Sequence, residues 1–353
     1  MELRRRRYHK PGTPPGTYDV AQTRSARPAS LAILDYDAST VRHGEGLQAL
    51  DREPALSNRW IRVSGAPSLD VLTSLERRFN IDPLVLEDVV NSGQRPKFND
   101  FDPALFLTLS VPCIPQQGGF EQLSIYVAPG ILITFMENEG DVFKPIEDRL
   151  RRSDSALRRS SVHYLLYALL DLSIDLLFPL LDRTAQRLED LETSIIQHPS
   201  DASLMDTHRF RNQLLIMRKI AWATREVVSE LLRHTDATEN VAIRPYLQDA
   251  YDHIVGVIDL VETQRDISTN LVEVYLSVIS NRMNEVIKLL TVISTLFIPA
   301  TFIASIYGMN FSRSAGPLNM PELDWPLGYL SVLGLIGLSM LGMLLYFRKK
   351  RWL

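Results

Sequence analysis

Two stretches without a charged side chain constrain this chain more than any other feature. Residues 289–309 and 327–347 contain no Asp, Glu, Lys or Arg. Each stretch has about 20 residues, and a helix of that length crosses the roughly 30 Å of hydrocarbon in a bilayer. The sequence therefore predicts two membrane spans, at 289–310 and 326–347, joined by an external loop at 311–325.

Cationic side chains precede the first span and follow the second. Arg282 and Lys288 precede the first span, and the segment 348–353 begins with four cations. The connecting loop carries one cation and two acids. Because Lys and Arg stay on the cytoplasmic side of spans, we expect a multi-pass protein of the cell (inner) membrane with both termini cytoplasmic.

Other features of the sequence exclude several protein classes. The segment 1–28 is basic, rich in Pro and Gly and without an apolar run, which predicts a disordered tail or a contact with anionic lipid, not a cleavable signal. The one cysteine, Cys113, excludes a disulfide framework. No basic stripe indicates nucleic acid, and no P-loop, HExxH or Gly-x-Ser-x-Gly motif indicates an enzyme or an organic cofactor.

Residues 29–159 have the pattern of a cytosolic α/β domain. Apolar stretches rich in Leu, Ile and Val, separated by turn residues, predict strands at 30–37, 58–65, 103–114, 122–129 and 131–138. Between the second and third strands, Ser68 begins one predicted helix and Pro83 lies in the first turn of another.

The segment 160–288 is predicted to be a cytosolic stalk of long helices. We expect one helix at 161–197 and a second at 204–233. From Tyr246 the helical apolar pattern continues without a breaker into the first span. An unbroken helix to residue 310 would have about 64 residues and a length of about 95 Å. Such a helix would connect a soluble domain to a membrane event.

Small and polar side chains recur along one face of this long helix. In a span they must face protein or water, because lipid cannot satisfy polar groups. The pattern is typical of a helix–helix seam or of a pore lining, and periodicity alone does not decide between them. A pore would need several copies of the chain, which turn each residue into a ring. The stripe comprises Glu273, Ser277, Ser280, Asn284, Ile287, Thr291, Ser294, Ile298, Thr301, Ser305 and Gly308.

Five segments together carry a resemblance to a known family. "YGMN" (307–310) ends the first span, "MPEL" (320–323) leads into the second, and "KKRWL" closes the chain. "LEDVVNSGQRPKF" (86–98) and "YDHIVGVIDLVETQRDI" (251–267) lie in the cytosolic part. The chain resembles the CorA family of magnesium and cobalt transport proteins over most of its length.

The resemblance implies a funnel-shaped homopentamer, with an α/β cytosolic domain, a long-helix bundle and two C-terminal transmembrane helices. Gly308, Met309 and Asn310 would form the selectivity filter, and Glu322 would lie in the external loop. Leu290 and Ile298 match apolar constrictions. The implied pore lining comprises Glu273, Asn284, Leu290, Thr291, Ser294, Ile298, Thr301 and Ser305.

The implied cargo is Mg²⁺, with Co²⁺ and Ni²⁺ as further ions, entering down the membrane potential. Mg²⁺ prefers six oxygens and dehydrates reluctantly. A ring of Asn310 carboxamides can accept hydrogen bonds from the water shell of the ion without stripping it. A neutral ring also binds weakly enough to release the ion, as conduction requires.

The resemblance further implies that cytosolic Mg²⁺ acts as a regulator between subunits. Asp88 and Glu87 match acidic positions near subunit boundaries, and Asp249 matches their partner on the adjacent subunit. Bound Mg²⁺ would offset the repulsion of facing carboxylates and favour the closed state. Further candidates, for which a solvated surface is the alternative, are Asp171, Asp175, Asp252 and Asp259.

One departure and two rival hypotheses accompany this reading. The connection between Asn310 and Met320, which joins the "YGMN" and "MPEL" segments, is longer than in many relatives. It places Arg313 near the outer mouth of the implied pore. A zinc or broad divalent-cation transporter of the sister branch is one alternative, although soft ligands are scarce. A non-conducting, membrane-anchored helical scaffold is the other, but it does not explain Asn284 and Asn310.

Overall fold

The computed structural model describes residues 2–3, 12, 14–17, 29–54, 56–113, 119–138, 141–237, 241–311, 316 and 319–352. The chain forms two compact units. The first comprises Met1–Ser194 and Ser200–Leu271, and the second comprises Ile195–Pro199 and Val272–Leu353. Most of the tail 1–28, and Arg313, lie outside the described residues, so the expectations for them stay predictions.

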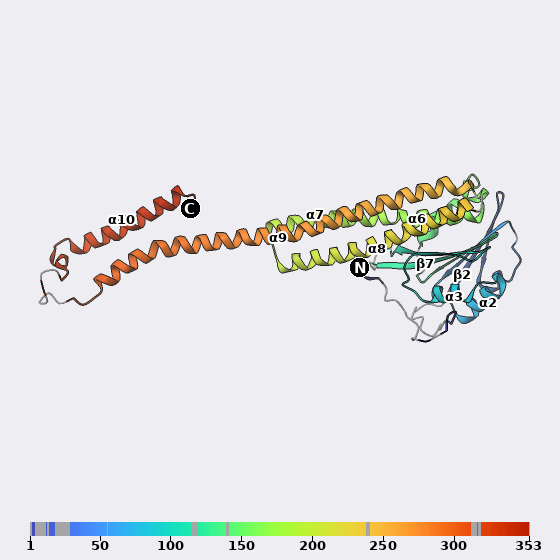
Figure 1. The fold of residues 1–353 in the computed structure, drawn as a ribbon, viewed down its shortest axis with the longest axis horizontal. Coiled ribbons are helices and arrows are strands. Elements are labelled where there is room, and N and C mark those ends of the chain that lie inside the picture. Colours follow the sequence, from blue (N-terminus) through green and yellow to red (C-terminus); the bar gives the residue numbers. More distant parts are fainter. Residues whose placement is uncertain are drawn as a thin grey trace. The chain divides into compact units, whose positions relative to one another are not determined.

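An eight-stranded sheet organises the first unit (Figure 1). The strand order is β3-β2-β4-β8-β7-β6-β5, and β1 pairs with β7 off this path. The β4–β8 and β1–β7 pairs are parallel, and the other pairs are antiparallel. The strands are β1 (Glu2–Leu3), β2 (Ser30–Tyr36), β3 (Val41–Glu45), β4 (Asn58–Ser64), β5 (Lys97–Asp100), β6 (Leu105–Pro112), β7 (Gly119–Ala128) and β8 (Ile131–Met136).

A row of apolar side chains crosses one face of the sheet and explains its register. Ile33, Ile61, Ile133, Tyr126 and Phe106 are paired from strand to strand, and all are buried. They share a core with the apolar faces of α2 (Leu69–Phe79) and α3 (Pro83–Val90). Because side chains alternate between faces along a strand, a slip of one residue would expose this row.

The two helices on that face begin as the sequence predicts. The Ser68 side chain accepts a hydrogen bond from Val71 N–H, and Asp82 accepts one from Leu84 N–H at 2.8 Å. Pro83 follows as the first residue of α3, where its missing N–H costs nothing. A short helix, α1 (Gly46–Leu50), follows β3.

Helices cover the opposite face of the sheet, where α6 (Val162–Asp175) packs on β4, β6, β7 and β8 (Figure 1). The helix expected at 161–197 forms as two consecutive elements, because α6 ends at Asp175 and α7 (Leu177–Gln197) begins one residue after Leu176. Pro179 lies in the first turn of α7 and has no N–H for the carbonyl of residue 175, so the helix breaks just before it. The other helices here are α4 (Lys144–Arg151), α5 (Ala156–Arg159) and α8 (Asp201–Ala237).

The long helix expected from Tyr246 is confirmed. Helix α9 runs without interruption over 64 residues, Arg244–Tyr307, and contributes to both units. At 1.5 Å per residue its length is about 95 Å. In the second unit, α10 (Gly328–Lys349) runs back antiparallel to the carboxyl-terminal part of α9 (Figure 1).

Three segments of described helix are long and apolar enough to cross a membrane: Val162–Gln197, Arg244–Tyr307 and Gly328–Lys349. Burial separates them. Inside the chain, 56% of the apolar window of the first is buried, against 6% for each of the other two. The first segment includes α6, whose apolar side chains already pack on the sheet. The two expected spans are therefore the segments left without cover.

Candidate functional site

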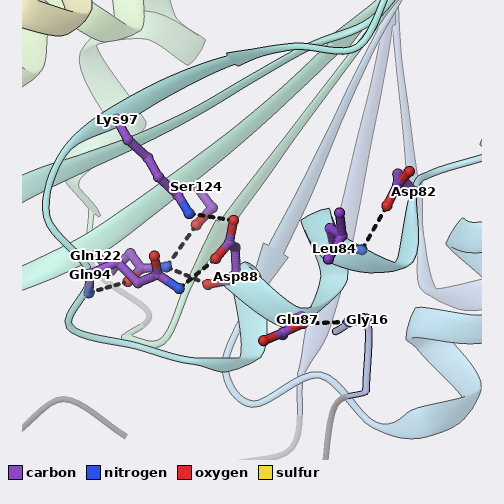
Figure 2. Close-up of polar contacts among 9 residues, drawn as sticks. All are labelled: Gly16, Asp82, Leu84, Glu87, Asp88, Gln94, Lys97, Gln122 and Ser124. Atoms are coloured by element: carbon purple, nitrogen blue, oxygen red, sulfur yellow. Dashed lines mark hydrogen bonds and ion pairs between the residues drawn. The ribbon is translucent and has the colours of Figure 1, made fainter. Parts of the chain in front are cut away.

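Asp88 on α3 lies in a set of polar contacts within its own chain (Figure 2). Its Oδ2 accepts a hydrogen bond from Lys97 Nζ at 2.5 Å, and its Oδ1 accepts one from Gln94 Nε2 at 2.6 Å. Gln122 Nε2 donates to the backbone carbonyl of Asp88 at 2.8 Å and to Ser124 Oγ at 3.0 Å. The carboxylate of Asp88 is thus paired, and an external cation has to displace Lys97 to bind it fully.

Glu87 points away from this set (Figure 2). Its Oε2 accepts a hydrogen bond from the Gly16 N–H at 2.6 Å. Gly16 has a φ of +79°, and a Cβ there would lie 3.2 Å from Pro83 Cβ. Glycine therefore allows residue 16 to approach the start of α3, and Glu87 holds it there.

Three acids on α6 and α9 gather around His253. Its Nδ1 lies 3.7 Å from Asp171 Oδ1 and 3.8 Å from Asp175 Oδ1, and its Nε2 lies 3.9 Å from Asp249 Oδ1. Each helix contributes two of the four residues, spaced by four, so each pair shares a helix face. We call these four residues the α6–α9 cluster. Asp88 makes no described contact with it.

The electrostatics of the α6–α9 cluster are those of a crowded set of acids. Burial raises the pKa of Asp171 above its ordinary value, and the charges of Asp175 and Asp249 raise it further, while His253 lowers it. Burial, followed by the charge of Asp171, also raises the pKa of Tyr167. Asp171 therefore resists ionisation, and a nearby cation would offset this effect.

The donors of this cluster fit a hard divalent cation. Asp171 Oδ1 and His253 Nδ1 are buried atoms without a hydrogen-bond partner among the described residues. Asp171, Asp175 and His253 each bring a ligand atom within 4.8 Å of the others, whereas Asp249 lies outside this group. The aspartates supply the oxygen ligands that Mg²⁺ prefers, while the His253 nitrogen suits softer ions. Asp252 is exposed and accepts a hydrogen bond from Gln248 Nε2 at 3.2 Å, outside the cluster.

The expected filter begins where α9 ends, at Tyr307. The Gly308 N–H donates to the Ala304 carbonyl at 2.9 Å, and a Cβ at Gly308 would lie 3.3 Å from that same oxygen. A side chain would crowd the last helical turn, which explains glycine here. Met309 and Asn310 follow, and both are exposed in the single chain.

The loop between α9 and α10 is fastened to the end of α9. Tyr307 Oη donates a hydrogen bond to Glu322 Oε1 at 3.1 Å. Glu322 belongs to a 3₁₀ turn, Pro321–Asp324, that follows Met320 in the left-handed region at φ 56°. A Cβ at Gly328 would lie well inside van der Waals contact with the Glu322 carbonyl oxygen. The Glu322 carboxylate is therefore held toward α9 and has a structural partner.

The polar stripe on α9 divides into satisfied and unsatisfied groups. The Thr291 and Thr301 hydroxyls donate to the carbonyls four residues earlier, at 2.8 and 2.9 Å, so neither requires a pore. The Asn284 and Asn310 carboxamides are exposed and have no partner among the described residues. Seven of the expected pore-lining residues are exposed and Ser294 is partly buried; the seven are Glu273, Asn284, Leu290, Thr291, Ile298, Thr301 and Ser305.

Several residues of these sites escaped the sequence reasoning. His253 lies one turn after Asp249, a spacing that could have indicated it. Lys97 and Tyr307 stand inside the recognised segments, but their partners are fixed only by the fold. Pro299 lies within α9; it removes one helical hydrogen bond inside the first span.

Comparison with known proteins identifies the family. The family described as "CorA-like Mg2+ transporter protein" matches residues 56–349. The chain belongs to the CorA family. It is 36% identical to the cobalt/magnesium transport protein CorA of Thermotoga maritima over 353 residues, which is 98% of each chain. Membership places it among membrane transporters of divalent cations rather than among enzymes.

Other CorA relatives agree with this assignment. The putative metal ion transporter YfjQ of Bacillus subtilis is 32% identical over 302 residues, covering 85% of this chain and 91% of that protein. The complete structure of the CorA magnesium transporter from Methanocaldococcus jannaschii superposes with a TM-score of 0.75 at 20% identity. It covers 92% of this chain and 98% of that chain, which supports the fold.

Proposed function

We propose that this CorA-family chain forms a homopentameric channel that admits Mg²⁺, and also Co²⁺ or Ni²⁺, into the cytoplasm. One observation carries the proposal: the two carboxamides that bracket the first span, Asn284 and Asn310, have no partner within the described chain. Polar groups in or beside a membrane need partners. Copies of α9 around a common axis would give each carboxamide a ring and an aqueous ion.

The proposed pathway follows from that arrangement. A ring of Gly308, Met309 and Asn310 selects the hydrated ion at the outer mouth, and Glu322 is held behind it by Tyr307. Exposed Leu290 and Ile298, at 63% and 66%, form apolar constrictions that gate by dewetting. Asn284 and Glu273 continue the pathway toward the cytoplasm. Both termini are cytoplasmic in this arrangement. An inside-negative membrane potential favours entry of a divalent cation by about 4.6 kcal/mol per 100 mV.

The α6–α9 cluster and the Asp88 set are the proposed regulatory sites. Cytosolic Mg²⁺ bound by Asp171, Asp175 and Asp249 would relieve their mutual repulsion. In the closed channel, Asp88 and Glu87 of a neighbouring copy would also contribute to binding this Mg²⁺. The ion then favours the closed state, because a ligand shifts an equilibrium toward the state that binds it better. Continuous α9 carries this change to the spans, since Asp249 and Asn284 lie on one helix.

Ion-resolved flux tests this function. The full-length protein is reconstituted into liposomes that contain a Mg²⁺ indicator, and an inside-negative membrane potential is imposed. We expect Mg²⁺ entry that rises with the potential and falls as internal Mg²⁺ increases. Zn²⁺ entry that follows a proton gradient, without Mg²⁺ entry, would indicate the zinc transporter instead. No flux of either ion would favour the scaffold.

A further inference from the structure

Residues 348–352, at the carboxyl-terminal end of α10, form a tight turn that we call the hook. The Trp352 N–H donates to the Phe347 carbonyl at 3.0 Å, and the Arg351 N–H donates to the Arg348 carbonyl at 3.1 Å. This pair of bonds is a Schellman motif, with Arg351 in the left-handed conformation at φ 57°. The Trp352 ring stacks on Phe347 with centroids 5.7 Å apart, which is the apolar contact that accompanies the motif.

The hook is docked on α9. Lys288 Nζ donates a hydrogen bond to the Arg351 carbonyl at 3.1 Å. This contact brings a cation of α9 beside the cations of the hook at the same end of the two apolar helices. Glycine is the usual residue at the left-handed position, so the chain accepts a strained conformation at Arg351 and keeps a charge there.

The cations at this end are unpaired within the part of the chain that the structure describes. Among the described residues, none of the five cations forms an ion pair. The second span contains no acid at all, and the four cations of the hook are exposed. The five cations are Lys288, Arg348, Lys349, Lys350 and Arg351.

Aromatic rings accompany the cations. Tyr346 is 56% exposed and Trp352 is 42% exposed, directly beside the charged residues in the sequence. Tyr and Trp favour the boundary between hydrocarbon and headgroups, because one part of each ring system is apolar and the other is polar. Five cations beside a span, flanked by two such rings, match the chemistry of an anionic lipid headgroup.

We propose that the hook and Lys288 bind the phosphate of an anionic phospholipid, and that this lipid holds the base of α10 against α9. The proposal rests on the membrane insertion and cytoplasmic carboxyl terminus of the proposed function. The fixed hook presents the cations together, so the headgroup meets a preorganised site rather than a mobile tail. Lipid binding therefore stabilises the protein in a way that a zwitterionic lipid does not reproduce.

The test measures the thermal midpoint of the full-length, detergent-solubilised protein during titration with phosphatidylglycerol or phosphatidylcholine. We expect phosphatidylglycerol alone to raise the midpoint saturably. Each basic side chain near an anionic surface contributes about 1 kcal/mol. The Lys349→Gln/Lys350→Gln variant should therefore bind phosphatidylglycerol about 30-fold more weakly. Arg351→Gly, which keeps and relaxes the hook, should bind about fivefold more weakly.

A matched control removes two exposed cations from the α/β unit, Arg42→Gln/Lys144→Gln, and should bind like the wild type. Equal stabilisation by both lipids, or wild-type binding by Lys349→Gln/Lys350→Gln, would overturn the proposal. The same midpoint shift with inorganic phosphate would assign the site to a free anion and would also overturn it. Ion flux in liposomes of either lipid tests the proposed function separately, since binding is read without transport.

Discussion

The two compact units differ in how they cover their apolar surface and pair their polar groups. In the first unit, the Arg59 side chain is 2% exposed and pairs with Asp35 through two hydrogen bonds of 2.6 and 2.8 Å, and Asp88 is paired with Lys97. In the second unit, the apolar windows are 6% buried, and the Asn284 and Asn310 carboxamides lack partners in the described chain.

This contrast shows which apolar surface is covered within a single chain. The first unit buries its own core and pairs several of its charges, although Asp171 Oδ1 and His253 Nδ1 lack a hydrogen-bond partner among the described residues. The two expected spans leave their apolar surface uncovered, and the Asn284 and Asn310 carboxamides beside them have no partner among the described residues, which is unfavourable in a membrane unless other copies or ions supply partners. The proposed channel is thus a property of the assembly, whereas the first unit is formed by one chain.

The largest expected effect tests the tight loop of the second unit. In Gly328→Ala the new Cβ meets the Glu322 carbonyl oxygen, so the loop has to shift at a cost of about 1–3 kcal/mol. We expect a lower thermal midpoint of the full-length protein and loss of Mg²⁺ flux. Gly334→Ala on the same helix is the control, because nothing described lies within 4 Å of its Cβ. Equal effects of the two substitutions would contradict this account of Gly328.

A second prediction tests whether the paired Asp88 competes with Mg²⁺. Lys97→Met removes the internal cation that occupies Asp88 Oδ2. Because a hydrogen bond to a charged group is worth about 1.5–3 kcal/mol, internal Mg²⁺ should close the channel at a concentration that is lower by at least roughly tenfold. Lys97→Arg, which keeps the charge, should resemble the wild type. Unchanged inhibition in Lys97→Met would show that Asp88 does not bind the regulatory ion.

A smaller effect is expected from the tether of the external loop. Tyr307→Phe removes the hydroxyl that donates to Glu322 Oε1 and leaves the ring in place. A hydrogen bond of this kind contributes about 1 kcal/mol, so Mg²⁺ flux should fall a few-fold without loss of assembly. If Glu322 acts only as a free carboxylate at the mouth, flux in Tyr307→Phe will not fall.

The smallest effect concerns pH and the first unit. Burial, with a contribution from His234, lowers the pKa of His163 below its ordinary value of 6.5. Folding therefore disfavours the imidazolium. The contribution of neutral His163 to the free energy of unfolding is constant above about pH 6.5. It is lost as the pH falls from there toward the lower folded-state pKa of His163. His163→Gln should flatten this part of a plot of thermal midpoint against pH. An unchanged slope would contradict the burial effect.

Sequence patterns were sufficient where local chemistry decides the structure. Ser68 and Pro83 indicated their helix starts, and the apolar stretches between turn residues predicted the five central strands. The two edge strands were missed. Strand β3, "VRHGE", has no apolar face of its own, and β5, "KFND", has four residues. Neither carries a periodic signal long enough to distinguish it from a loop.

The sites were predictable in part. The helical step of four on α9 indicated the stripe, and the family segments indicated Asp88, Asp249 and the filter. The partners were not predictable, because they are set by long-range packing: His253 meets Asp171 from another helix, and Gly16 meets Glu87 from 71 residues away. Whether a polar group is paired inside the chain depends on that packing, and the difference between the two units follows from it.

The central claim is that the unpartnered carboxamide of Asn310 forms the ion filter. Potential-driven Mg²⁺ entry into liposomes tests it most directly, with the wild type compared with Asn310→Ala and with Asn212→Ala. Asn212 is an exposed asparagine on α8 and serves as the matched control. The account predicts entry in the wild type and in Asn212→Ala, and none in Asn310→Ala. Wild-type Mg²⁺ entry through Asn310→Ala would contradict it.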